Sequence, residues 1–220
     1  MILTLNTNGT LIDEDWAAFF GEHRPRRVNI TLYGASEATY RSLCRYEGYE
    51  KTVRAIKLLR AHDVDVKING SAVRENFQDM EAMYALAKEL DVPVHMDTYM
   101  LPGLHDRLLP IDQQSRLSPE DAAWAELQTM KNEYPAEIYE DYRQRKLKQL
   151  REPVASPCNI SCMAAHCSFT INWQGRMKPC VMQPEPAVSV FDMGFEAAWK
   201  QIIEGAKPLC FNEKCGSCAY

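Results

Sequence analysis

The 220-residue chain (25.2 kDa) contains 46% hydrophobic and 25% charged residues, which is ordinary for a soluble globular protein. Its net charge of −5 provides no basic surface for nucleic acid or an anionic membrane, and no apolar run approaches the roughly 18 residues of a membrane span. Residues 1–5 carry no basic segment of a secretory signal, so the eight cysteines predict a reducing, cytoplasmic setting.

Residues 1–100 alternate between short β-type runs and helical runs. We expect strands at 2–6, 28–32, 64–68 and 92–96. The intervening helices are expected over 13–20, about 49–59 and 75–90. This order predicts right-handed crossovers and a parallel sheet.

The predicted strands alternate apolar and polar residues, whereas fully covered parallel strands usually read as continuous apolar runs. Val28 and Ile30 alternate with Asn29 and Thr31, for example, and 64–68 repeats the pattern. A solvent-facing sheet would explain this. An open or partial barrel explains it better, with helices on one face and a polar lumen that binds a ligand at the carboxyl ends of the strands.

Two sets of residues test this barrel hypothesis. We expect one common concavity to be lined by Asn6, Asn8, Thr31, Tyr33, Lys67 and Asn69. We expect the helices to cover Leu5, Ile30 and Ile68.

Residues 101–157 predict a helical linker region. The segment 101–114 is loop-like, and Ser118 with Pro119 is a strong helix start. That helix should end near Glu133. A charged helix should then begin at Pro135 and run to about residue 151, followed by a short linker.

Seven of the eight cysteines fall in residues 158–220, in two groups about thirty residues apart. They are Cys158, Cys162, Cys167, Cys180, Cys210, Cys215 and Cys218. Thiolates that converge from separate parts of a chain hold iron–sulfur clusters or zinc. A hairpin of 168–173 and 176–179 would bring Cys167 near Cys180, and a short helix is expected over 191–203.

The same cysteines are also compatible with a disulfide framework, with buried free thiols or with a zinc site. A disulfide framework suits small secreted domains, and free buried thiols behave as small hydrophobic groups. Zinc is the stronger competitor, because Cys215 and Cys218 have a zinc-knuckle spacing. Cys44 is far from the rest in sequence and is best read as a buried thiol.

The segments LTLNTNGTLI, VNITLYGASEATYRSLC, VKINGSAVRENFQDM and PVHMDTYMLP resemble, in this order, the second half of a radical S-adenosylmethionine (radical SAM) barrel. CMAAHCSFTINWQGRMKPC and CFNEKCGSC resemble the SPASM extension, which binds auxiliary iron–sulfur clusters. The resemblance implies an α/β fold: the second half of a partial (β/α) barrel over 1–100, with a small cysteine-rich α+β extension over 158–220. Its most specific element is the spacing of Cys162, Gly175 and Cys180.

The resemblance also implies SAM contacts at Asn8, Ser36 and Asn69. Each has a plainer interpretation from its own chemistry. Asn8 before Gly9 suits a turn, Ser36 can cap a helix, and Asn69 can form a turn.

The cysteines correspond to the family pattern in part. Cys162, Cys167 and Cys180 match three ligands of the first auxiliary cluster, and we expect them to share one metal site. Cys215 and Cys218 match the start of the second ligand segment. Cys158 and Cys210 have no direct counterpart, and either could substitute as a ligand.

Two departures from the family matter. The C-x3-C-x2-C motif that binds the catalytic cluster has no counterpart, and the chain ends at Tyr220, where the family has further cysteines. We therefore expect an incomplete SPASM domain and a fragment of a larger enzyme. We expect the fragment to have no catalytic residue of its own and to be inactive in SAM cleavage.

The expected function is thus that of a radical SAM/SPASM enzyme fragment that modifies a peptide or protein through a 5′-deoxyadenosyl radical. Its cofactors would be an auxiliary [4Fe–4S] cluster and SAM, and its reductant a flavodoxin or ferredoxin. A zinc-stabilised module that binds a ligand or peptide without catalysis is the alternative, and a remnant without a cofactor is a third. No nucleic-acid or membrane partner is expected.

Overall fold

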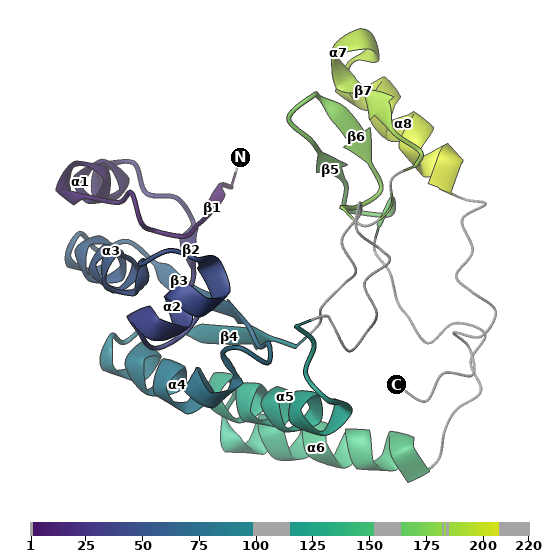
Figure 1. Cartoon of the computed structure of the whole chain (residues 1–220). Coiled ribbons are helices and arrows are strands. Elements are labelled where there is room, and N and C mark those ends of the chain that lie inside the picture. Colours follow the sequence, from purple (N-terminus) through teal and green to yellow (C-terminus); the bar gives the residue numbers. More distant parts are fainter. Residues whose placement is uncertain (1, 99–114, 152–163, 182, 184, 207–220) are drawn as a thin grey trace. The chain divides into compact units, whose positions relative to one another are not determined.

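The computed structural model describes residues 2–98, 115–151, 164–181, 183 and 185–206. Contacts between residues divide the chain into two compact units, residues 1–142 and 143–220 (Figure 1). Each unit is described by itself.

The first unit is built on a four-stranded parallel sheet. Its strands are β1 (Thr4–Thr7), β2 (Arg27–Thr31), β3 (Val66–Ser71) and β4 (Val94–Asp97). They lie side by side in chain order, with Leu5 opposite Val28 and Ile30 opposite Ile68. The predicted alternation of strands and helices with a parallel sheet is confirmed.

Helices connect each strand to the next. They are α1 (Glu14–Glu22), α2 (Glu37–Cys44), α3 (Tyr49–Ala61), the 3-10 turn η1 (Phe77–Asp79) and α4 (Met80–Glu89). Because the strand order never reverses, crossovers of one hand place their helices on one face of the sheet (Figure 1). Asp13 caps α1 as predicted, since its Oδ1 accepts the Trp16 amide at 3.0 Å.

The core lies between the helices and one face of the sheet. Ile30 and Ile68 are fully buried there, together with Ile56, Leu59 and Met83 from the helices, and Leu5 is partly buried against them. Burying each such side chain contributes about 1.5–3 kcal/mol relative to leaving it exposed. The alternating residues of β2 and β3 on the opposite face are only partly buried, so the predicted division into an apolar and a polar face is confirmed.

The strand expected over 2–6 begins at Thr4 and the strand expected over 28–32 begins at Arg27. The starts of the other two strands differ from the prediction for one shared reason. The expected strands at 64–68 and 92–96 begin two residues later, at Val66 and Val94. In each case the preceding valine closes the turn after a helix: Val64 donates its amide to Leu59 O and Val92 donates to Ala87 O, both at 3.0 Å. Each of these turns contains an aspartate with positive φ, and an apolar pattern cannot separate such a turn from a strand.

Two further helices were predicted correctly. In α5 (Pro119–Glu133), Ser118 accepts the Asp121 amide at 3.1 Å, and Pro119 occupies the first turn. Helix α5 packs against β4, where Thr129 donates to Met96 O at 3.2 Å. Helix α6 (Ala136–Arg151) follows. Among the described residues, no helix is both long and apolar enough to cross a membrane.

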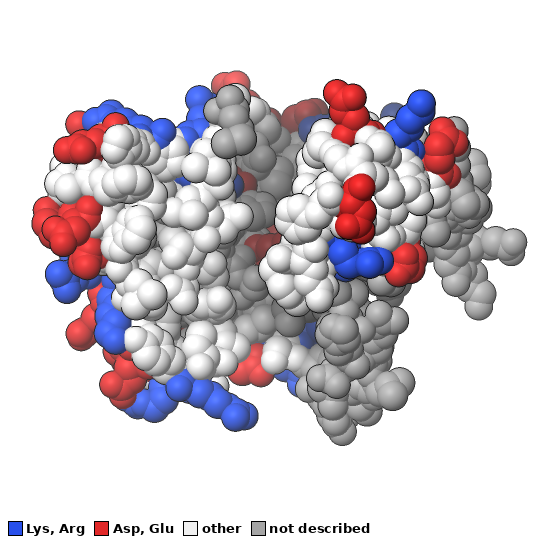
Figure 2. Space-filling view, turned by 90° about the horizontal axis from the view of Figure 1, so that it is seen from above, with Lys and Arg blue, Asp and Glu red and all other residues white. Residues whose placement is uncertain are grey.

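The surface of the first unit around α1 is apolar. Leu11 is 86% exposed and Trp16 is 50% exposed, and the Trp16 ring stacks on Phe20 with centroids 5.6 Å apart. Seen from above, the left-hand part of the molecule shows a broad uncharged surface with charged residues mainly at its margin (Figure 2).

The second unit contains a three-stranded antiparallel sheet and two helices. Its elements are β5 (Thr170–Ile171), β6 (Arg176–Lys178), β7 (Val188–Ser189), α7 (Val190–Met193) and α8 (Phe195–Ala206). The predicted hairpin is confirmed, with Gly175 at φ +72° in its turn. The single helix expected over 191–203 is two helices, because Gly194 adopts φ +79° between them, and β7 was not predicted. Met177 and Ile202 are fully buried in the core of this unit.

Candidate functional site

The carboxyl ends of β1, β2 and β3 border a hollow of about 620 Å³, which we call the carboxyl-edge hollow. It is lined by Asn8, Thr10, Tyr33, Tyr40, Leu43, Cys44, Tyr46, Ser71 and Val73. Ligands of parallel α/β folds bind at this edge of the sheet, because the loops that follow successive strands meet there.

The turn after β1 fixes Asn8 at the rim of this hollow. Asn8 Oδ1 accepts hydrogen bonds from the amide and the hydroxyl of Thr10, at 3.1 and 3.0 Å. Gly9 is buried at φ +75°, and a Cβ there would lie 3.2 Å from the Cβ of Ala55. The Asn8 side chain is therefore oriented with Oδ1 in the turn. Its Nδ2 has no protein partner among the described residues.

Tyrosines form one wall of the hollow. Tyr40 is 3% exposed, and its hydroxyl accepts the Tyr33 amide at 3.2 Å. The rings of Tyr33 and Tyr40 meet edge to face with centroids 5.8 Å apart. Burial raises the pKa of Tyr40, and burial also raises the pKa of the Cys44 thiol, so both groups are protonated at neutral pH. The structure finds Cys44 partly buried, close to its sequence interpretation.

Two side chains from the segment after β3 hold the loop after β2. Asn76 is fully buried and donates its Nδ2 to Tyr33 O and Ser71 O, both at 2.9 Å. Asp79 Oδ2 accepts the Ala35 amide at 2.8 Å. Sequence reasoning missed both residues, because their partners lie some forty positions away in the chain.

The three predicted SAM contacts do not line one hollow. Asn8 lines the carboxyl-edge hollow. Ser36 is the N-cap of α2, where its Oγ accepts the Thr39 amide at 3.2 Å. Asn69 lines a hollow of about 300 Å³ on the polar face of the sheet, which we call the polar-face hollow.

The six residues expected to share one concavity do not line one hollow. Asn8 and Tyr33 line the carboxyl-edge hollow and Lys67 and Asn69 line the polar-face hollow, whereas Asn6 and Thr31 line neither of the two. The reason is geometric. Asn8 and Tyr33 follow the ends of their strands, where the chain has already left the plane of the sheet.

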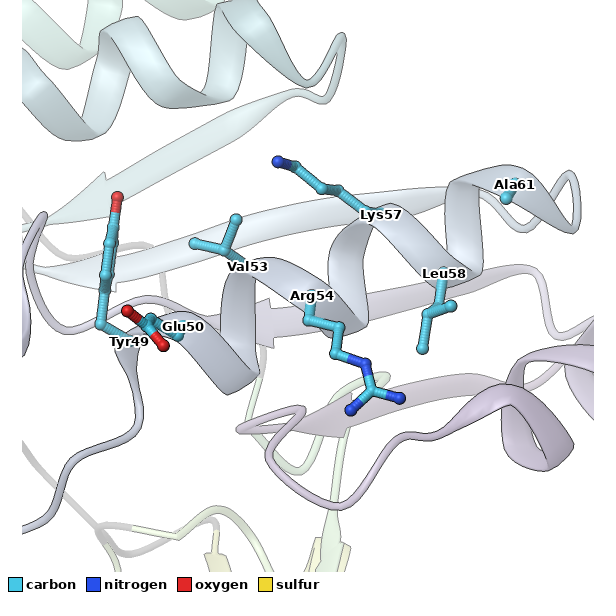
Figure 3. A pocket seen from close by; sticks show the side chains of 7 residues that line it. All are labelled: Tyr49, Glu50, Val53, Arg54, Lys57, Leu58 and Ala61. Atoms are coloured by element: carbon cyan, nitrogen blue, oxygen red, sulfur yellow. The ribbon is translucent and has the colours of Figure 1, made fainter.

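A third hollow, of about 470 Å³, runs along α3. All seven of its lining residues come from this one helix, and Figure 3 shows Arg54 and Lys57 pointing to opposite sides of it. Binding sites need polar groups that converge on one point. This groove lacks that convergence and is not a candidate site.

Most of the predicted metal ligands lie outside the described residues: Cys158, Cys162, Cys210, Cys215 and Cys218. Of the remaining two, Cys167 is exposed and Cys180 is partly buried. In the hairpin, Thr170 is opposite Lys178. Beyond this ladder Ser168 pairs with Ala164 and Cys180 pairs with Gln183, so the shared metal site of Cys167 and Cys180 stays a prediction.

Comparison with known families shows what the first unit is similar to. The family model described as "Radical SAM superfamily" matches residues 1–107, which contain the sheet, its helices and the carboxyl-edge hollow. Over these residues, just under half of the chain, the protein is similar to the radical SAM superfamily of enzymes.

Curated relatives agree with this assignment. An AdoMet-dependent heme synthase of Methanosarcina barkeri is 23% identical over 237 aligned residues, covering 99% of this chain and 66% of the relative. A cysteine-type anaerobic sulfatase-maturating enzyme of Clostridium perfringens is 30% identical over 91 residues, covering 40% of this chain and 24% of the relative. The chain thus spans less than two thirds of the length of either relative.

Solved structures share the fold. The structure titled "Native anSMEcpe with bound AdoMet and Cp18Cys peptide" superposes with a TM-score of 0.64 at 20% identity, covering 99% of this chain and 63% of that one. Streptococcus suis SuiB bound to its precursor peptide SuiA superposes with a TM-score of 0.63 at 13% identity, covering 98% and 52%. The α/β fold of this chain matches these radical SAM partial barrels.

The superfamily implies SAM and a [4Fe–4S] cluster, and the described residues fit the two differently. For SAM, the carboxyl-edge hollow offers an amide donor, hydroxyl groups and aromatic rings. For the cluster, no three Cys, His, Asp or Glu side chains within the described parts of the chain could hold a metal ion together.

Proposed function

We propose that residues 1–107 bind SAM in the carboxyl-edge hollow, as part of a radical SAM enzyme. The observation that supports this most directly is the position of the hollow at the carboxyl ends of three parallel strands, within the residues that the family model matches. SAM bound beside a reduced [4Fe–4S] cluster supplies a 5′-deoxyadenosyl radical, which abstracts hydrogen from a substrate.

The residues of the hollow would bind and orient SAM. The Asn8 Nδ2 would donate a hydrogen bond to it, and the Tyr33 ring would provide a flat surface for the adenine. Ser36 and Asn69 remain predicted contacts. Ser36 would act from the loop beside the hollow and Asn69 from the polar face of the sheet.

A peptide or protein is the proposed substrate. Two of the similar structures, anSMEcpe and SuiB, contain bound peptides. In the second unit we propose an auxiliary [4Fe–4S] cluster with ligands among Cys158, Cys162, Cys167, Cys180, Cys210, Cys215 and Cys218. A flavodoxin or ferredoxin would supply electrons.

We further propose that this 220-residue chain does not cleave SAM by itself. Reductive cleavage needs a cluster with an open iron site, and the sequence contains no C-x3-C-x2-C motif to hold one. The test is 5′-deoxyadenosine production from SAM and dithionite after anaerobic reconstitution. Product at the level of a protein-free control is expected, and turnover above that level would overturn the proposal.

SAM binding can be tested without turnover, by equilibrium dialysis with radiolabelled SAM. The Asn8→Ala variant should weaken binding about tenfold, because a good hydrogen bond to a ligand contributes about 1.4 kcal/mol. Asn132→Ala, on the exposed surface of α5, is the matched control and should bind as the wild type does. Equal binding by both variants would remove Asn8 from the site, and undetectable binding by the wild type would contradict the SAM proposal.

Metal content separates the proposed cluster from its zinc alternative. Anaerobically purified protein should contain iron and acid-labile sulfide rather than zinc. Cys167→Ala and Cys180→Ala should each lower the iron content, whereas Cys44→Ala should leave it unchanged. A stoichiometric zinc content without sulfide would favour a zinc-stabilised binding module instead.

A further inference from the structure

The polar-face hollow brings together positively charged and amide side chains. It measures about 300 Å³ and is lined by Thr4, Arg26, Arg27, Asn29, Lys67 and Asn69. Strand pairing sets these residues side by side, because Thr4 is opposite Arg27 and Asn29 is opposite Lys67. Three cations thus gather on one face of a protein whose net charge is −5.

Only one of these cations is neutralised. Arg27 binds Asp65 through its Nε at 3.1 Å and through a terminal nitrogen at 3.0 Å. The side chains of Arg26 and Lys67 have no hydrogen bond or ion pair within the described residues, and Lys67 is partly buried. A partly buried charge without a counterion is unfavourable, and the unbalanced potential of such a hollow attracts anions.

The neutral groups of the hollow add hydrogen-bond donors. Asn29 Nδ2 gives one hydrogen to Asn6 Oδ1 at 2.8 Å and keeps a second. The amide of Asn69 has no side-chain partner within the described residues. No carboxylate lines the hollow itself. A surplus of donors around two free cations suits a ligand that only accepts hydrogen bonds and carries negative charge.

We propose that the polar-face hollow is a binding site for an oxyanion group, phosphate or carboxylate, held by Lys67 and Arg26 and oriented by the amides of Asn29 and Asn69. The site is distinct from the carboxyl-edge hollow. Arg27 begins β2 and Tyr33 follows its end. Six residues of extended chain separate these two residues, which is roughly 20 Å at about 3.3 Å per residue. The hollows approach each other on β3, where Asn69 of the polar-face hollow lies two residues before Ser71 of the carboxyl-edge hollow.

The test titrates the ¹⁵N-labelled full chain with sodium phosphate, and separately with sodium acetate, at constant ionic strength set with sodium chloride. We expect saturable shifts of the Asn29 and Asn69 side-chain amide signals with at least one of the two anions. The anion that saturates at the lower concentration identifies the preferred class. Shifts that rise linearly with both anions, or no shifts at all, would overturn the proposal.

Variants assign the binding to these cations. Lys67→Gln and Arg26→Gln should each weaken binding about tenfold, and Lys67→Arg should retain it because the charge is kept. Lys57→Gln on α3 is the matched control, since its charge lies on the helical side of the sheet and should not affect binding. Thermal melting confirms that each variant is folded. Equal affinity in Lys67→Gln and wild type would refute the site.

Addition of SAM tests whether the two hollows are separate. Asn69 is also a predicted SAM contact, so the Asn29 signal is the readout, and SAM should leave the phosphate-induced shift of Asn29 unchanged. Displacement of phosphate by SAM would show that the polar-face hollow receives the SAM carboxylate, and a distinct oxyanion site would then be wrong.

Discussion

The carboxylate of Asp79 accepts the hydroxyl proton of Thr39 at 2.6 Å. Because Thr39 has one hydroxyl hydrogen and gives it to Asp79, the 3.1 Å contact between Ser36 Oγ and Thr39 Oγ1 must have Ser36 as donor. Ser36 Oγ also accepts the Thr39 amide, at 3.2 Å. One acceptor position remains on Ser36, so it can receive a hydrogen bond from a ligand but has no proton left to donate.

Removal of the Asp79 carboxylate should loosen the loop after β2. Asp79→Ala leaves the Ala35 amide and the Thr39 hydroxyl without their acceptor, so we expect the free energy of unfolding to fall by about 2–3 kcal/mol. Urea unfolding measures this, and hydrogen exchange at the Ala35 amide reports the loop directly. Asp15→Ala, on the exposed face of α1, is the control and should cost about 0.5 kcal/mol. Equal costs for the two variants would show that Asp79 does not hold the loop.

Asn76 joins the segments that follow β2 and β3 through one side-chain amide. It accepts the Val73 amide at 2.8 Å and donates to two carbonyl oxygens. Asn76→Asp keeps the acceptor but sets a second carboxylate oxygen against those carbonyls in a fully buried position. We expect a loss of about 3 kcal/mol or more in urea unfolding. The same exchange at exposed Asn132 should cost less than about 0.5 kcal/mol, and a similar loss at both positions would contradict the bridging role.

Periodicity in the sequence was sufficient to predict the parallel sheet of the first unit and the helices that cover one of its faces. The alternation of Val28 and Ile30 with Asn29 and Thr31 identified both faces of the sheet, because only one of them packs on helices. The same information could not locate the strand ends. Val64 is as buried as Val66 in the strand that follows, yet the Val64 amide closes the turn after α3.

The site was predicted less completely, for a physical reason. The turn at Asn8 could be predicted because it is local, and the prediction of Ser36 as a helix cap is confirmed, whereas both residues stay predicted ligand contacts. Asn76 and Asp79 hold the loop after β2 through Tyr33 and Ala35, which lie more than forty positions away, so neither spacing nor composition predicts these contacts. The charge of the polar-face hollow arises in the same way, from strand register rather than from a charged run in the sequence.

The contact between α4 and α5 should weaken at high pH. Tyr84 lies 2.7 Å from the Thr129 hydroxyl, and burial raises the pKa of Tyr84 to about 12. An unfolded tyrosine has a pKa near 10, so between pH 10 and 12 the unfolded chain releases a proton that the folded chain retains. The stabilisation by neutral Tyr84 is therefore complete below pH 10 and is lost as pH rises toward 12.

The Tyr84→Phe variant isolates this effect. At pH 7 it should lose about 1 kcal/mol, the value of one buried hydrogen bond. Between pH 9 and pH 12 the free energy of unfolding should fall by up to about 2 kcal/mol more in the wild type than in Tyr84→Phe, because only the wild type has the titrating group. Tyr134→Phe, at an exposed tyrosine, should follow the wild-type profile. Parallel profiles for wild type and Tyr84→Phe would contradict the assignment of the effect to Tyr84.

A side chain at Gly175 should strain the turn of the second unit. A Cβ there would lie 2.2 Å from the Phe191 ring, and φ is +72°. Because the Phe191 ring is 80% exposed, it can move aside, so Gly175→Ala adds only a modest cost to the backbone strain of positive φ, and we expect a loss of about 2 kcal/mol. Gly194→Ala is a matched control, because φ is +79° but nothing lies within 4 Å of its Cβ position. That variant should lose only about 1 kcal/mol of stability, from backbone strain.

Thermal unfolding compares the two variants. It is followed by the fluorescence of Trp199, with the remaining tryptophans replaced by phenylalanine. The double variant Gly175→Ala with Phe191→Ala should recover part of the loss by removing the ring, and failure to recover any of it would show that the clash with Phe191 is not the cause.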